Sequence, residues 1–195
     1  MNPYQRLDTF EMPPGFRGRH GWYVQLWWIV QALLFAPSPQ FMYGWRRWLL
    51  RRFGARVGEG VILRPTMRTQ FPWKVSIGDH AWVGDDVVLY SLGPIAIGAH
   101  AVISQRSYLC TGSHDPTQPN FPIYYRPIVI GGGCWIATDV YVGPGVTIGD
   151  GTIVGARSSV YRDLPAGKVC LGNPARAIRD REVGPPRDGR LSLAC

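Results

Sequence analysis

The segment that decides the fold runs from Ile128 to Tyr161 and reads IVIGGGCWIATDVYVGPGVTIGDGTIVGARSSVY. An aliphatic residue recurs in it every six positions, at Ile130, Ile136, Val142, Ile148, Val154 and Val160. Four positions after each of the first five comes a small or modest side chain, at Cys134, Val140, Val146, Thr152 and Ser158. This spacing matches neither the 3.6-residue period of a helix nor the two-residue period of a strand. It is the signature of a repeat architecture.

The same period extends over most of the chain. It begins at Val57 and Leu63, slips, restarts at Ile77, slips again, and continues from Ile97 to Leu109 before resuming at residue 130. Three hexads make one triangular coil of short parallel strands, so residues 57–171 predict about five stacked coils. A lone coil buries about three large aliphatics, worth roughly 1.5–3 kcal/mol each, which does not offset about 1 kcal/mol per residue of backbone ordering. Only a capped stack is predicted to be stable.

Composition and charge limit the number of domains, the possible partners and the cellular compartment. The 195 residues suffice for one sizeable domain, and the net charge of +8 is concentrated at the two ends. Residues 1–56 hold 8 basic and 2 acidic side chains, whereas residues 57–160 hold 6 and 7. Basic ends suit solubility, an anionic membrane surface or a phosphorylated ligand, and no nucleic-acid partner is expected. The four cysteines show no C-x-x-C spacing, and no secretory signal precedes the repeat, so a reducing cytoplasm is expected.

The N-terminal part is apolar, aromatic and basic. Residues 21–36 are too short to cross a bilayer, which needs about 20 residues, and prolines follow them. The next helix is predicted to carry its arginines on one polar face, at positions 46, 47, 51 and 52, beside Trp48. Two interpretations stay open: residues 21–53 lie at a membrane interface, at the inner face of the membrane, or they form a helical hairpin that packs on the domain or on another subunit.

Two other segments depart from the repeat. Residues 112–128 form an excursion that contains four prolines, and a long stiffened loop that leaves a solenoid is usually functional. After residue 160 the repeat fades, residues 177–182 predict a short helical turn, and the last dozen residues read as a loose tail.

The repeat, the segment ISQRSYLCTGSHDP (Ile103–Pro116) and the C-terminal G-N-P-A-R resemble the hexapeptide-repeat acyltransferases. Within this superfamily the chain is most similar to the colanic-acid and exopolysaccharide biosynthesis acetyltransferases, and it also resembles the maltose, galactoside and nodulation-factor O-acetyltransferases. The resemblance covers about residues 57–180. It implies an all-β fold, a left-handed parallel β-helix of about five coils, with an N-terminal helical hairpin and a protruding loop. Three parts are expected: the N-terminal arm and helices (1–56), the β-helix domain (57–172) and the GNPAR segment with the tail (173–195).

The resemblance places the catalytic histidine at His114, at the start of the excursion. In that family this residue is the general base that takes the proton of the acceptor hydroxyl, and histidine can do so near neutral pH. Related sugar acetyltransferases have an asparagine near Asp85 that contacts the acceptor; here the aspartate is expected to bind a sugar hydroxyl or to orient His114. The neighbouring Asp115 is a second candidate for orienting the imidazole. His80 and His100 are read as solvated corner residues.

The resemblance also predicts where acetyl-CoA binds, in a groove between neighbouring subunits of a homotrimer. The matching groove positions are Trp135, Ala137, Thr138, Gly155, Ala156, Tyr161 and Arg162. Near the pantetheine arm or the phosphates we expect Asn173, Arg176 and Arg179, because the arginine fork suits phosphate.

The expected function is therefore acetyl-CoA-dependent O-acetyl transfer to a saccharide, free or lipid-linked, in exopolysaccharide or other surface glycan biosynthesis, with no metal required. Two alternatives remain. A metal-binding β-helix of the γ-carbonic-anhydrase type would need three convergent histidines, and the spacing of His80, His100 and His114 does not match that family. An inactive β-helix scaffold would not bind acetyl-CoA.

Overall fold

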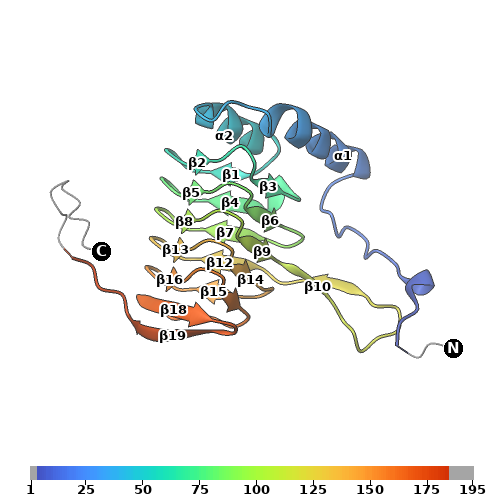
Figure 1. The fold of residues 1–195 in the computed structure, drawn as a ribbon. Coiled ribbons are helices and arrows are strands. Elements are labelled where there is room, and N and C mark those ends of the chain that lie inside the picture. Colours follow the sequence, from blue (N-terminus) through green and yellow to red (C-terminus); the bar gives the residue numbers. More distant parts are fainter. Residues whose placement is uncertain (1–3, 185–195) are drawn as a thin grey trace.

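The computed structural model describes residues 4–184. Figure 1 shows a stack of short strands that forms a solenoid, with helices across one end and a hairpin projecting from its side. Most strands fall into three parallel sheets, so that each coil contributes one strand to each sheet. The five coils expected from the six-residue period are present, and β18 adds one further strand.

The three sheets are named here A, B and C in the order in which each coil enters them. Sheet A contains β1 (Arg56–Val57), β4 (Val75–Ile77), β7 (Ile95–Ile97), β12 (Ile128–Ile130) and β15 (Thr147–Ile148). Sheet B contains β2 (Ile62–Leu63), β5 (Trp82–Val83), β8 (Val102–Ile103), β13 (Trp135–Ile136), β16 (Ile153–Val154), β18 (Lys168–Gly172) and β19 (Ala175–Asp180). Sheet C contains β3 (Arg68–Thr69), β6 (Val88–Tyr90), β9 (Tyr108–Cys110), β14 (Tyr141–Val142) and β17 (Ser159–Val160).

The aliphatic residues of the repeat fill the interior of the solenoid. Every one of them, from Val57 to Val160, is buried in a single core cluster. The first slip in the period lies between Thr69 and Ile77. Thr69 keeps the six-residue spacing from Leu63 and occupies the inward position of β3, where its hydroxyl hydrogen-bonds to Ser91 Oγ at 3.2 Å. After Thr69 the chain inserts the short helix η3 (Pro72–Lys74) before the next coil begins.

The backbones of neighbouring coils approach closely at the corners, which is why the repeat has small residues there. A Cβ added to Gly98 would lie 2.5 Å from the backbone nitrogen of Gly132 in the next coil, closer than any side chain tolerates. Other corner residues adopt a positive φ, including His80 and His100 on the edge between sheets A and B. Positive φ is uncommon outside glycine, so these corners are held in shape by the hydrogen bonds between coils.

A helical hairpin closes the first coil, as one of the two interpretations expected. It consists of α1 (Gly21–Val30), the π-helical turn η2 (Gln31–Phe35) and α2 (Tyr43–Arg52), and it follows an arm that contains the short helix η1 (Leu7–Thr9). Figure 1 shows both long helices across the end of the stack. Side chains of the hairpin supply the hydrogen bonds that a further coil would have supplied: Trp27 Nε1 donates to Thr69 O, and Gln31 Oε1 accepts from Thr69 N.

The four arginines of α2 do not share the single polar face that was predicted. Arg46 is fully buried and donates to Leu63 O. Arg47 donates to Val61 O, and Arg51 donates to Val57 O. Strands at the end of a stack expose unpaired carbonyls, and arginine offers five donors that reach them. Three of the four arginines therefore face the solenoid.

The C-terminal segment also differs from its prediction. Residues 175–180 form the strand β19, antiparallel to β18, where a helical turn was expected. Arg181 then donates to the carbonyls of Gly133 and Gly151. The predicted loose tail lies mostly beyond residue 184, outside the described residues, and the expected domain boundary after residue 172 falls within the β18–β19 hairpin.

Candidate active site on two edges of the solenoid

His114 projects from the edge between sheets C and A. The chain leaves the third coil after β9 and forms the hairpin of β10 (Gly112–His114) and β11 (Ile123–Tyr125), which projects from the stack in Figure 1. The His114 ring stacks on Phe121, with centroids 4.4 Å apart and planes 9° apart. Its Nδ1 lies 2.8 Å from the carbonyl oxygen of Phe121. A carbonyl can only accept, so Nδ1 carries the proton and the lone pair of the neutral ring is on Nε2.

The group that orients the His114 ring within the chain is the carbonyl of Phe121. Within one chain, neither candidate carboxylate, Asp85 or Asp115, hydrogen-bonds to the His114 ring. Asp115 instead accepts from Thr117 and from Gln118 Nε2, and these bonds lower the pKa of Asp115. Sequence reasoning missed the orienting group, because it is the backbone carbonyl of a residue seven positions away.

The hairpin is fastened to the rest of the molecule by the N-terminal arm. Lys74 Nζ donates to Phe16 O and Leu92 O, and it lies 4.6 Å from the ring centroid of Tyr125 on β11. Burial lowers the pKa of Lys74. The backbone nitrogen of Arg6 donates to Pro119 O near the hairpin tip. The arm thus holds the segment that presents His114.

We expect Phe121→Ala to lower kcat by about tenfold, because the stacked ring fixes the imidazole and misplacement of a catalytic group is costly. The Phe121 carbonyl and the fold remain, so the thermal unfolding midpoint should not change. Steady-state kinetics with Phe121→Tyr as the matched control, which keeps the stack, will check this. A raised KM for the acceptor with unchanged kcat would instead mark Phe121 as a substrate contact.

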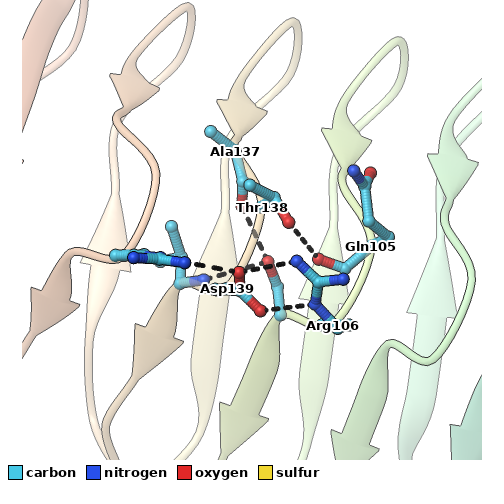
Figure 2. Close-up of polar contacts among 8 residues, drawn as sticks. Gln105, Arg106, Ala137, Thr138 and Asp139 are labelled. Carbon is cyan, nitrogen blue, oxygen red and sulfur yellow. Dashed lines mark hydrogen bonds and ion pairs between the residues drawn. The ribbon is translucent and has the colours of Figure 1, made fainter.

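A second group of predicted residues lies on the edge between sheets B and C. Its corners carry Ala137 and Thr138 in the fourth coil and Gly155 and Ala156 in the fifth, with Trp135 on β13 beside them. Figure 2 shows Thr138 Oγ1 directed at Gln105 O, a hydrogen bond of 3.0 Å between neighbouring coils. The Trp135 side chain is largely exposed, and its indole donates to Ser104 Oγ at 3.0 Å.

The same edge carries charges that alternate from coil to coil. Asp86, Arg106, Asp139 and Arg157 occupy equivalent corner positions, all with φ between 56° and 60°. Arg106 makes a two-pronged ion pair with Asp139, at 2.7 and 2.9 Å (Figure 2). This pair lowers the pKa of Asp139.

Asp85 lies on this edge in the second coil and not beside His114. Its carboxylate pairs with Arg64 Nε at 2.7 Å and accepts from Thr66 Oγ1. It lines a groove of about 580 Å³ together with Trp82 and Arg106. The structure therefore brings Asp85 together with the predicted donor residues, along one edge, while His114 lies on another.

Although they lie on different edges, His114, Asp85 and Thr138 belong to neighbouring coils and so lie at similar heights along the solenoid axis. His114 leaves the third coil, Asp85 belongs to the second, and Thr138 to the fourth. Neighbouring strands in a sheet are about 4.8 Å apart. The base is thus level with the boundary between the groove at Asp85 and the corner at Thr138.

The remaining predicted residues divide between two places. Tyr161 and Arg162 are exposed on the C/A edge, on the same side as His114. Asn173, Arg176 and Arg179 are exposed on the β18–β19 hairpin at the end of sheet B. No hydrogen bond or ion pair among the described residues joins these five side chains to His114.

Between the two edges, sheet C presents a row of tyrosines. Tyr90, Tyr108, Tyr141 and Tyr161 follow one another with ring centroids 5.7 to 6.3 Å apart. Burial raises the pKa of Tyr108 to about 12 and raises that of Tyr141 as well. The row is thus a neutral, half-buried aromatic surface that separates His114 from the donor residues within one chain.

The histidines do not converge. His80 and His100 stack on each other on the A/B edge, with centroids 5.2 Å apart, whereas His114 leaves the C/A edge. Within residues 4–184 no three His, Cys, Asp or Glu side chains gather into a metal-binding group.

Comparison with known proteins agrees with this arrangement. A family model described as bacterial transferase hexapeptide (six repeats) matches residues 127–162. The chain is 62% identical over 177 residues to the Escherichia coli (strain K12) protein named "Putative colanic acid biosynthesis acetyltransferase WcaF", and the match covers 91% of this chain and 97% of that protein. The chain belongs to the hexapeptide-repeat acetyltransferases. As a member of this family it is an acyltransferase.

Solved structures support the same assignment. A galactoside acetyltransferase in complex with coenzyme A has 26% sequence identity and a TM-score of 0.77, covering 88% of this chain and 85% of that one. The hexapeptide-repeat acetyltransferase VCA0836 of Vibrio cholerae O1 biovar eltor, complexed with acetyl coenzyme A, has 27% identity and a TM-score of 0.72, covering 87% and 88%. The left-handed parallel β-helix implied by the resemblance is confirmed.

Proposed function

We propose that this protein transfers the acetyl group of acetyl-CoA to a hydroxyl of a saccharide, with His114 as the general base. The observation that carries the proposal is the hydrogen bond from His114 Nδ1 to the Phe121 carbonyl at 2.8 Å. It fixes the tautomer whose Nε2 is free to accept a proton. The imidazole is half-buried on a projecting hairpin, where an acceptor can reach it.

The proposed reaction is a direct transfer. Nε2 takes the proton of the acceptor hydroxyl as its oxygen attacks the thioester carbonyl. The carbon–sulfur bond then breaks, and the coenzyme A thiolate takes the proton back from the imidazolium. A positioned base of this kind contributes about 10²–10⁴ in rate.

The site requires a second copy of the chain. Within one subunit, sheet C with its tyrosine row separates His114 from Thr138 and Ala156. We infer that a homotrimer brings the C/A edge of one subunit against the B/C edge of its neighbour. The thioester would then lie at the level of the third and fourth coils, between His114 and the corner at Thr138.

Both substrates have matching surfaces on the B/C edge. Trp135, Ala137, Thr138, Gly155 and Ala156 would line the pantetheine arm of acetyl-CoA, chiefly through backbone, with Tyr161 and Arg162 facing it from the neighbour. Exposed Arg176 and Arg179, with Asn173, would meet its phosphates, since the arginine fork matches phosphate geometry. The groove beside Asp85 and Trp82 would hold the saccharide.

The biosynthesis of a surface polysaccharide is the proposed setting. The name of the relative in Escherichia coli, which refers to colanic acid biosynthesis, supports it. The acceptor is a saccharide, free or carried on a lipid, and a cytoplasmic location remains a prediction.

The experiment that tests this function measures coenzyme A release from acetyl-CoA with a panel of free and lipid-linked saccharides. We expect turnover with at least one saccharide, and a product with one added O-acetyl group by mass spectrometry. Acetyl-CoA binding without turnover on any saccharide would contradict the proposal. Stoichiometric zinc in the purified protein would favour the carbonic-anhydrase-like alternative, and absence of acetyl-CoA binding would favour an inactive scaffold.

A further inference from the structure

Helix α1 and the π-helical turn η2 that continues it are mostly apolar on every side, yet protein covers only one side. The exposed stripe that they share is called the α1 stripe below. Val24, Trp27 and Phe35 are buried against the solenoid. The opposite side carries Trp22, Leu26, Ile29 and Leu33, spaced four, three and four positions apart, so that they form one stripe. A helix that is apolar all round is normally covered on every side. None of the described helices is long and apolar enough to cross a bilayer.

The side chains of the stripe are exposed to solvent. Trp22 and Leu33 are each 67% exposed, and Ile29 is 55% exposed. Phe41, at 79%, and Trp48, at 53%, extend the same apolar end of the molecule. Tryptophan beside aliphatic side chains is typical of a surface that sits at the boundary between headgroups and acyl chains.

The positive charge around the stripe favours an anionic partner. Residues 12–58 contain seven arginines and no aspartate or glutamate. Among the residues that the structure describes, no ion pair involves this segment: Arg46, Arg47 and Arg51 donate to neutral carbonyls and so keep their charge. Arg52, on the outer side of α2 with Trp48, is exposed. A second copy docked stripe to stripe would bring seven positive charges against seven, which is unfavourable.

We propose that the capped end of the solenoid binds an anionic lipid bilayer surface, with the α1 stripe (Trp22, Leu26, Ile29 and Leu33) inserted among the headgroups. The arginines of residues 12–58 supply the attraction to anionic lipid. This binding does not depend on acetyl transfer. Within residues 21–53, the segment expected from the sequence to contact a membrane, the proposal assigns the contact to this stripe and not to the arginines of α2.

The test is co-sedimentation of the full chain with vesicles of phosphatidylcholine mixed with phosphatidylglycerol in equal parts, against phosphatidylcholine alone. We expect binding to the anionic vesicles, weakened by added salt because screening reduces the attraction. The variant Leu26→Ser/Ile29→Ser/Leu33→Ser should bind at least about tenfold more weakly, because it removes the inserted apolar area.

The matched control is Ile178→Ser/Val183→Ser, which removes two exposed apolar side chains from the opposite end of the chain and should bind like the wild type. Leu33→Ser alone, at one of the two most exposed stripe positions, should lose part of the binding and serves if the triple variant does not fold. The proposal is overturned if the wild type stays in the supernatant with anionic vesicles, or if the stripe variants sediment as the wild type does. It is equally overturned if the stripe variants lower the oligomer mass by light scattering, since a second copy would then cover the stripe.

Discussion

We expect the His114→Ala variant to transfer acetyl groups about 10²–10⁴-fold more slowly than the wild type, the range in which a positioned general base contributes. The loss should appear in kcat, with the affinity for acetyl-CoA unchanged, because the groups proposed to hold the pantetheine arm and the phosphates do not include the His114 side chain. The side chain stands on a projecting hairpin outside the buried core, so thermal unfolding should not change. Coenzyme A release with a saccharide acceptor measures the rate.

The matched controls are His80→Ala and His100→Ala. Both residues are exposed on the A/B edge, stacked on each other and away from the hairpin. Their rates should equal that of the wild type. Equal turnover in His114→Ala and in these controls would reject His114 as the base, whatever the acceptor.

The second large effect concerns stability. Arg46→Met should lower the free energy of unfolding by about 3 kcal/mol or more, since hydrogen bonds to a charged group are worth roughly 1.5–3 kcal/mol each and their buried acceptors would be left unpaired. The guanidinium donates to Leu63 O, Pro39 O and Ser38 Oγ at 2.7 to 2.9 Å and is fully buried. Methionine keeps much of the side-chain length and packing. For a chain of this size the loss corresponds to a thermal midpoint lower by about 6–12 °C.

Arg52→Met on the same helix is the control. Arg52 is exposed, and a surface substitution of this kind usually changes stability by less than about 0.5 kcal/mol. Thermal unfolding followed by circular dichroism compares the two variants. Equal shifts in both would mean that the arginines act through the overall charge of the cap, and not through the carbonyls of the first coil.

The solenoid could be predicted from the sequence because its aliphatic residues recur with a fixed period. The inward positions, such as Ile130, Val142 and Val154, must be aliphatic in every hexad, and the corner after each must be small, as the close approach of Gly98 to the next coil shows. Where the aliphatic series is interrupted, at Thr69, a polar side chain fills an inward position and hydrogen-bonds to Ser91, which no hydrophobic count detects.

The site was less predictable, because it depends on contacts between distant residues. The resemblance located His114, but the group that orients it is the carbonyl of Phe121, and backbone atoms leave no mark in composition. The spacing of the arginines of α2 predicts one polar face. It does not reveal their carbonyl partners, such as Leu63 O and Val61 O, which lie up to 17 positions away. The β19 strand, too, follows from pairing with β18 and not from its own sequence.

The helical hairpin that caps the first coil also prevents other chains from adding to that end of the solenoid. An uncovered coil is an edge that templates the addition of another chain, which is how β-structures grow into fibres. Trp27, Gln31 and Arg46 hydrogen-bond to backbone donors and acceptors that an incoming strand would need. The N-terminal hairpin therefore acts as a terminator of polymerisation, and a chain shortened to its repeats would be prone to fibril growth from that end.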